Sequence, residues 1–285
     1  MADDMISILP ADYTTGRFIG RALAPEGPVV IAIRDGMLYD LTNVTPSVSG
    51  ALARRAFDGG DKLGLIADGL PEGWSLLSPI DLQCIKASGV TFAVSAIERV
   101  IEERARGDAQ SAQDIRAQLE DKIGAGIRAV VPGSAEAEQL KQALIDEGMW
   151  SQYLEVAIGP DAEIFSKSPV LSSVGHAQQI GIRSDSSWNN PEPEVVLVCD
   201  AHGEILGATL GNDVNLRDFE GRSALLLSKA KDNTASCAIG PFIRLFDDAF
   251  TLEDVRKADV ELLIEGPEGY RLEGRNEMAQ ISRGP

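Results

Sequence analysis

Cysteine, histidine and basic residues are scarce in this chain of 285 residues. It has three cysteines, which are far apart and form no C-x-x-C pair, and two histidines. This spacing fits a reducing, cytoplasmic setting, in which we expect buried, unreactive thiols. The 44 acidic residues outnumber the 26 basic ones, which gives a net charge of −18. Binding to nucleic acid or anionic membranes is therefore not expected, because both depend on clustered Lys and Arg.

Long apolar runs are also missing from the sequence. No run approaches the roughly 18 residues that a membrane-spanning helix needs. The first ten residues, MADDMISILP, are acidic where a secretory signal needs positive charge. We therefore predict neither a membrane partner nor an export signal.

Short apolar runs separated by turn signals organise the chain. Residues 18–23, 28–33 and 36–41 read as strands, and a helix is expected near Ser47–Phe57. Apolar residues three and four apart predict a helix over 91–107, and two more helices are expected over 109–123 and 134–148, the last beginning at Ser134. The further predicted strands are 153–159, 163–167, 178–182, 194–200, 204–211, 242–247 and 260–266. This order predicts an α+β fold with a small β-rich N-terminal domain over residues 1–80 and a second domain over 81–285.

Two glutamates lead into one of these strands, in the stretch PEPEVVLVCD. Residues two apart on a strand point the same way, roughly 7 Å apart, so Glu192 and Glu194 can converge. Asp213 follows the next strand and is a candidate third acid. Three carboxylates without a nearby Cys or His suit Mg²⁺ or Mn²⁺, and such a cation would offset the repulsion between the glutamates.

The same residues also have a purely structural interpretation. Prolines and charges together are a common way to protect the edge of a sheet, and Glu192 and Glu194 alternate with Pro191 and Pro193. A spacing of two between glutamates is a weak signal, so both interpretations stay open on the residues alone.

The run from about residue 152 to 248 resembles the catalytic domain of the fumarylacetoacetate hydrolase superfamily. The wider sequence is similar to the branch that dehydrates 2-keto-3-deoxy-xylonate or -arabinonate in pentose catabolism. The resemblance rests on Glu192-Pro193-Glu194, Asn212-Asp213, Leu216-Arg217-Asp218 and Lys231, which stands nine residues before Gly240-Pro241.

The resemblance implies a fold and a set of roles. It implies a mixed β-roll and a homodimer or larger homo-oligomer that acts on a small 2-keto acid. The metal, Mg²⁺ or Mn²⁺, would be held by Glu192, Glu194 and Asp213. Arg217 and Lys231 would face the substrate, with Lys229 as the competing choice for Lys231 and Lys167 as a further candidate.

Two departures from the hydrolase pattern concern the chemistry. Glu220 stands where the hydrolases carry glutamine. Ser95 stands where their water-activating histidine is expected, while Glu98, its partner, is retained. Without the imidazole, hydrolysis lacks its general base, which favours a lyase. The candidates for proton transfer are then Glu98, Lys231 and Glu220.

The resemblance also implies that the chain lacks a C-terminal part of the β-roll, because family members continue beyond the position of Pro285. We therefore expect a truncated catalytic domain. The alternatives to a dehydratase are a hydrolase of a 1,3-diketo acid, a decarboxylase of an oxo acid, or an inactive truncated homologue.

Overall fold

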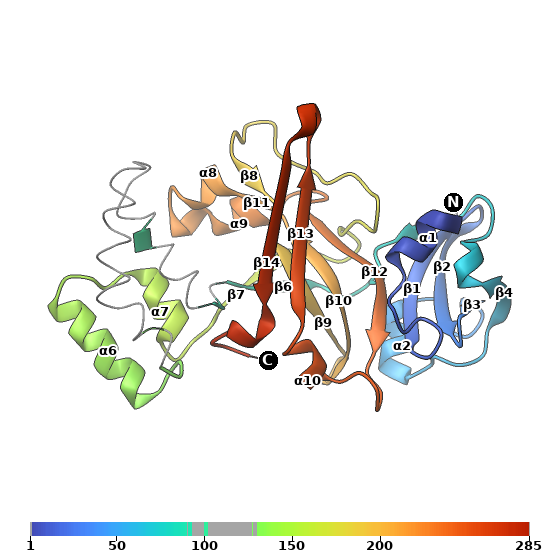
Figure 1. Cartoon of the computed structure of the whole chain (residues 1–285), viewed down its shortest axis with the longest axis horizontal. Helices are drawn as coiled ribbons and strands as arrows, with labels where there is room; N and C mark the ends of the chain where they lie inside the picture. The colour runs from blue at the N-terminus through green and yellow to red at the C-terminus, as the bar shows by residue number, and fades with distance from the viewer. Residues whose placement is uncertain (1, 90, 93–99, 102–126, 128–129, 285) are drawn as a thin grey trace. The chain divides into compact units, whose positions relative to one another are not determined.

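The chain is described by a computed structural model that covers residues 2–89, 91–92, 100–101, 127 and 130–284 (Figure 1). It divides into two compact units. The first comprises residues 1–85, 166–220 and 225–276, and the second comprises 86–165, 221–224 and 277–285. No helix among the described residues is long and apolar enough to span a membrane.

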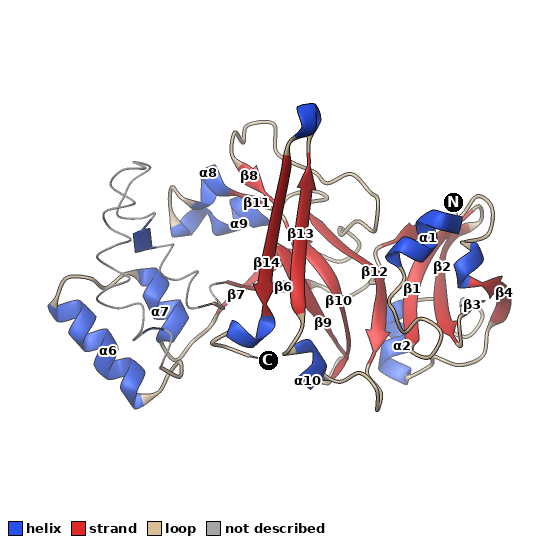
Figure 2. Cartoon of the chain, viewed as in Figure 1, coloured by secondary structure: helices blue, strands red, loops and turns tan. Residues whose placement is uncertain are grey.

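Strands predominate over helices in the described residues (Figure 2). The helices are α1 (Ala2–Ile8), α2 (Val48–Arg54), α6 (Ala135–Asp146), α7 (Gln152–Ile158), α8 (Arg217–Glu220), α9 (Leu227–Lys231) and α10 (Leu252–Val255). The strands are β1 (Arg17–Ala24), β2 (Gly27–Arg34), β3 (Met37–Asp40), β4 (Asp61–Leu65), β5 (Ser75–Leu77), β6 (Ile85–Gly89), β7 (Glu163–Ser168), β8 (Asn189–Asn190), β9 (Pro193–Cys199), β10 (Ile205–Asp213), β11 (Asn215–Leu216), β12 (Cys237–Leu245), β13 (Asp259–Glu265) and β14 (Arg271–Glu277).

An eight-stranded sheet forms the centre of the first unit. Its strands lie in the order β4-β3-β2-β1-β12-β10-β9, with β5 paired to β1. Strand β1 pairs antiparallel with β12, which in turn pairs with β10, so the N-terminal strands and the strands of the predicted site share one sheet. The predicted domain boundary at residue 80 stays a prediction; the chain leaves the first unit at residue 85.

Alternate residues of the first strands pack into two different cores. Ile19 and Val30 belong to a cluster that also holds residues of β9, β10 and β12. Their neighbours Phe18 and Ile31 belong to another cluster, on the side of Met5. Because side chains alternate along a strand, this part of the sheet is buried on both faces, which explains its nearly continuous apolar sequence.

The second unit holds α6 and α7, and the predicted strand over 153–159 is wrong. The segment is helix α7, which begins where the Ser151 side chain accepts a hydrogen bond from the backbone N–H of Tyr153. Leu154, Ala157 and Ile158 are buried at helical spacing in the apolar cluster of this unit. The run of apolar residues correctly indicates burial, but its buried residues follow the period of a helix and not that of a strand.

Other predicted elements have mixed outcomes. Strands β1, β2, β3, β7, β9, β10, β12 and β13 confirm their predictions, as do helix α2 and helix α6 with its Ser134 cap. The predicted strand over 178–182 is wrong. The segment is a loop, in which the backbone N–H of Gly181 donates a hydrogen bond to Ala235 O at 2.8 Å. The helices predicted over 91–107 and 109–123 lie almost wholly outside the described residues.

The cysteines are free thiols, and only one has the predicted burial. Cys84 and Cys199 are exposed, whereas Cys237 is buried. Burial raises the pKa of the Cys237 thiol to about 11, so this thiol is protonated at neutral pH.

Candidate metal centre

The three acids predicted as ligands lie side by side at one end of the β9–β10 pair. The strands are antiparallel, so the start of β9 adjoins the end of β10, with Glu194 opposite Gly211. Beyond that pair, the backbone N–H of Asp213 donates to Glu192 O at 2.9 Å. The sheet register thus brings Glu192, Glu194 and Asp213 together from two strands.

Lys231, at the end of α9, lies between two of these acids. Its ammonium donates to Glu192 Oε2 and to Asp213 Oδ2, the latter at 3.0 Å. Burial acts to lower the pKa of Lys231, but the charges of Glu192 and Asp213 outweigh it and hold the pKa above its ordinary value. Lys231 is therefore a charged counter-ion that Glu192 and Asp213 share.

Lys167, on β7, is a second buried cation beside Asp213. Its Nζ lies 3.0 Å from Asp213 Oδ1 and donates to Val214 O at 2.8 Å, to Ser236 Oγ at 3.3 Å and to Lys231 O. Burial lowers the pKa of Lys167, against the raising effect of Asp213. With three hydrogen-bond acceptors and the Asp213 carboxylate around its ammonium, Lys167 is placed to hold Asp213, and its predicted place facing the substrate stays a prediction.

Glu194 differs from the other two acids. Among the described residues no side chain forms a hydrogen bond or ion pair with its carboxylate. Burial, followed by the charges of Asp213 and Glu192, raises the pKa of Glu194 to about 8. The side chain is nevertheless accessible, because it lines an open pocket of about 470 Å³. Glu194 thus lies in the wall of an open pocket, where a ligand can reach its carboxylate.

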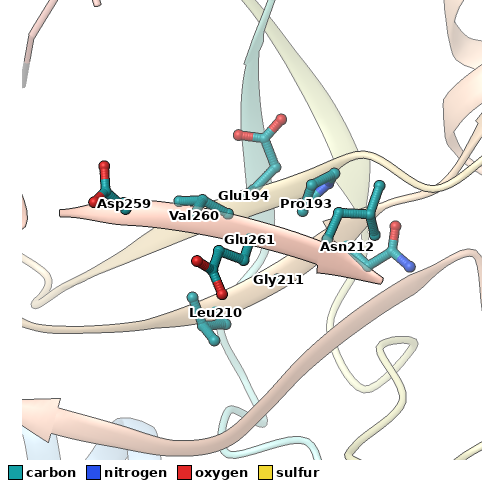
Figure 3. Close-up of a pocket in the computed structure, with 9 residues that line it drawn as sticks. Pro193, Glu194, Leu210, Gly211, Asn212, Asp259, Val260 and Glu261 are labelled. Carbon is teal, nitrogen blue, oxygen red and sulfur yellow. The ribbon is translucent and has the colours of Figure 1, made fainter. Parts of the chain in front are cut away.

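The pocket beside Glu194 is formed by three strands (Figure 3). Pro193 and Glu194 come from β9, and Leu210 from β10. Strand β13 supplies a further wall that carries both acidic and apolar side chains, namely Asp259, Val260, Glu261 and Leu262. The pocket is large enough for a small organic acid, since ligand sites range from roughly 300 Å³ upward.

Arg217 and Glu220 form the side of the centre built by α8. Arg217 Nη1 lies 3.3 Å from Glu220 Oε2, and both side chains are largely buried. The amide of Asn215 donates to that same Glu220 oxygen and, at 3.0 Å, to Glu192 Oε1. Arg217 therefore neutralises Glu220, and Asn215 connects Glu220 to the predicted ligand Glu192.

The described residues do not contain three Asp, Glu, His or Cys side chains already converged as a metal-binding group. Lys231 occupies the space between Glu192 and Asp213 instead. The donor set nevertheless has the chemistry that Mg²⁺ takes, since it consists of carboxylate oxygens on adjoining strands. The uncompensated Glu194, with its raised pKa, marks a place where added positive charge is favourable. The residues therefore fit a divalent cation, provided that Lys231 moves aside.

Most predicted site residues are brought together. Glu192, Glu194, Asp213, Lys231, Lys167, Arg217 and Glu220 all belong to the first unit. Glu98 lies outside the described residues. Asn215 was not predicted, and its one signal was a polar residue between the apolar Val214 and Leu216.

Comparison with known proteins supports the predicted branch. No family model matches the chain. A 2-dehydro-3-deoxy-D-arabinonate dehydratase of Saccharolobus solfataricus is 44% identical over 86 residues, which is 30% of this chain and 29% of that protein. A probable 2-keto-3-deoxyxylonate dehydratase of Haloferax volcanii is 28% identical over 246 residues, 82% of this chain and 68% of that protein. The chain thus aligns with under a third of the first relative's length and about two thirds of the second's.

Solved structures show the same fold. A 2-keto-3-deoxy-D-arabinonate dehydratase complexed with magnesium and 2,5-dioxopentanoate has a TM-score of 0.65 at 23% identity, over 94% of this chain and 78% of that one. A fumarylacetoacetate hydrolase from Exiguobacterium antarcticum has a TM-score of 0.55 at 17% identity, over 94% and 78% of the two chains. The chain thus has the fold of these dehydratase and fumarylacetoacetate hydrolase structures, and its sequence is similar to those of 2-keto-3-deoxy sugar-acid dehydratases.

Proposed function

We propose that the protein is a Mg²⁺- or Mn²⁺-dependent dehydratase of a 2-keto-3-deoxy sugar acid. The observation that carries the proposal is the meeting of Glu192, Glu194 and Asp213 at one end of the β9–β10 pair, in a chain related to such dehydratases. These three carboxylates would hold the cation. When bound, the cation supplies a Lewis acid that polarises the 2-keto group and favours loss of a C3 proton.

The chain's own residues would bind the substrate and move protons. Arg217 would face the substrate carboxylate, if it exchanged part of its contact with Glu220. Lys231, released from Glu192 and Asp213 when a metal binds, would become a mobile ammonium beside the pocket. Glu220 is the described carboxylate that could take or return a proton, and Glu98 is a further candidate outside the described residues.

The proposed reaction is a β-elimination. The C3–H bond breaks and its electron pair forms a C3–C4 double bond while the C4 hydroxyl leaves as water, so the substrate loses one H₂O. From a five-carbon acid, tautomerisation then gives 2,5-dioxopentanoate, the molecule found with magnesium in the related dehydratase structure. A role in pentose catabolism, a cytoplasmic setting and assembly as a homodimer or larger oligomer belong to the same proposal.

Incubation with 2-keto-3-deoxypentonate tests the proposal. With Mg²⁺, we expect an aldehyde product, detected with a semialdehyde dehydrogenase coupled to NADP⁺ reduction. Without Mg²⁺, or with Glu194→Gln, we expect no product. If no aldehyde forms while cleavage of an acylpyruvate is observed, the hydrolase alternative replaces the dehydratase.

A further inference from the structure

Asn215 connects the two halves of the candidate centre. It lies on the short strand β11, which pairs with Asn190 on β8, and its side chain is wholly inaccessible to solvent. Its Nδ2 donates to Glu192 Oε1 at 3.0 Å and to Glu220 Oε2. One neutral amide thus supplies both of its protons to two separate carboxylates.

The orientation of this amide follows from its neighbours. Turned the other way, its oxygen would face two carboxylate oxygens, which repel it, whereas the NH₂ group satisfies both. No donor among the described residues meets the other end of the amide. Asn215 Oδ1 is buried and accepts no hydrogen bond from the described residues. The position therefore uses Asn215 as a pair of donors.

The two oxygens of Glu192 have different partners as a result. Oε1 is fixed by the Asn215 amide, and Oε2 meets the Lys231 ammonium. The amide partner is uncharged and buried, so it has no reason to leave when a cation arrives. The ammonium partner is repelled by an incoming cation and sits on a side chain that can rotate. Oε2 is therefore the oxygen free to change partners.

We propose that Asn215 is a positioning residue that fixes Glu192 as a single-oxygen metal ligand and holds Glu220 beside it. The inference deepens the proposed function and rests on it. Groups that hydrogen-bond to metal ligands typically contribute 10- to 100-fold to metal affinity. Asn215 makes that contribution to Glu192 while keeping a second carboxylate, neutralised by Arg217, at the edge of the centre.

Metal binding to variants of the full chain tests this inference. We expect Asn215→Ala to weaken Mg²⁺ binding, measured by titration calorimetry, by about 10- to 100-fold. Asn215→Ser has nearly the same volume as the alanine variant but restores one donor, so its loss should be smaller. Equal losses in the two variants would indicate packing alone and would overturn the proposal, as would wild-type affinity in both.

A matched control and a second measurement complete the test. Asn43, far from the centre in sequence, also donates to a carboxylate (Asp61 Oδ2, 3.3 Å), and Asn43→Ala should leave Mg²⁺ affinity unchanged. If Asn215→Ala does not fold, Asn215→Ser decides, and wild-type affinity in that variant overturns the proposal. If the wild-type chain binds no metal, the proposed function fails, and the metal-free melting temperature then tests the bridge itself. Asn215→Ser and Glu220→Gln together should lower it by less than the sum of their separate effects, whereas additivity would overturn the bridge.

Discussion

Three carboxylates at the β9–β10 end are neutralised unequally, and this inequality gives the centre its properties. Glu192 and Asp213 share the ammonium of Lys231, and Asp213 also meets Lys167. Glu194 has no such partner within the described residues, and its pKa is raised to about 8. A site with one carboxylate left uncompensated is ready to accept a cation.

The raised pKa of Glu194 predicts a pH dependence for the metal-free protein. The folded state keeps a proton on Glu194 between pH 4.5 and about 8, where the unfolded chain has lost it. The folded state therefore binds more protons, and its free energy of unfolding should fall as pH rises through this window. Urea denaturation in EDTA should show this fall, and Glu194→Gln should reduce it. An equally steep fall in both proteins would show that other groups cause it.

The same proton predicts that Mg²⁺ affinity rises with pH. Binding requires Glu194 to lose its proton, so each titration below pH 8 should release protons and give a weaker apparent affinity. Calorimetry in buffers of different ionisation enthalpy measures the number released. We expect proton release at pH 6.5 and little at pH 9. No release at pH 6.5 would contradict the assignment of Glu194 as a ligand.

Lys231→Met tests the counter-ion role of Lys231. Without the ammonium, Glu192 and Asp213 lose a shared partner inside the protein, and removing one member of a buried ion pair costs roughly 3–5 kcal/mol. We expect a loss of this order in EDTA, and recovery of part of it with Mg²⁺, which would take the place of the lost charge. Lys229→Met is the control, because Lys229 lies over the Phe219 ring and meets neither acid. A variant as stable as wild type in EDTA would contradict the role.

At the level of the elements, apolar runs predicted strands well where both faces of the sheet are buried and the strand is therefore apolar throughout. Strands β1 and β2 could be recognised because both faces are covered and the run is nearly unbroken. The run at 153–159 has the same composition but belongs to helix α7, with Leu154 and Ile158 one turn apart. Over seven residues, composition alone does not separate a buried helix from a strand.

The acids of the candidate centre could be predicted from the sequence, whereas the side chains that contact them could not. A spacing of two between glutamates, followed by an aspartate at a strand end, follows from strand geometry. The partners of these acids depend on segments distant in the chain, as when Lys167 reaches Asp213 and Lys231 reaches Glu192. Asn215 could not be distinguished from a loop residue without knowing that β11 buries it.

The N-cap of α7 gives a prediction at this scale. Ser151 is buried, and its hydroxyl accepts from the Tyr153 backbone at 3.2 Å. Ser151→Ala should lower the free energy of unfolding by about 1 kcal/mol, because one N–H at the helix start loses its acceptor. Calorimetric melting measures the loss. Mg²⁺ affinity should stay unchanged, because the Ser151 hydrogen bond is local to the start of α7; a weakened affinity would contradict a local role for this cap.

For the molecule as a whole, one sheet connects the N-terminal strands to the candidate centre. Strand β12 pairs with β1 on one side and with β10 on the other. Strand β9, which carries Glu194, is the last strand of the described sheet. This position is compatible with a role of Glu192, Glu194 and the neighbouring prolines in protecting the sheet edge. The buried contacts of Asp213 with Lys167 and Lys231 favour a functional centre instead.

The melting temperature as a function of Mg²⁺ concentration tests the central claim most directly. A cation that binds only the folded protein adds stability as RT ln(1 + [Mg²⁺]/Kd), so the melting temperature should rise steadily with the logarithm of Mg²⁺ concentration above Kd. We expect this rise in the wild-type chain and its near loss in Glu194→Gln. The series should extend from zero to ~10 mM Mg²⁺, far above the dissociation constant of an effective metal site. A melting temperature that stays constant over this range would contradict the claim. Glu192 and Glu194 would then be residues that protect a sheet edge.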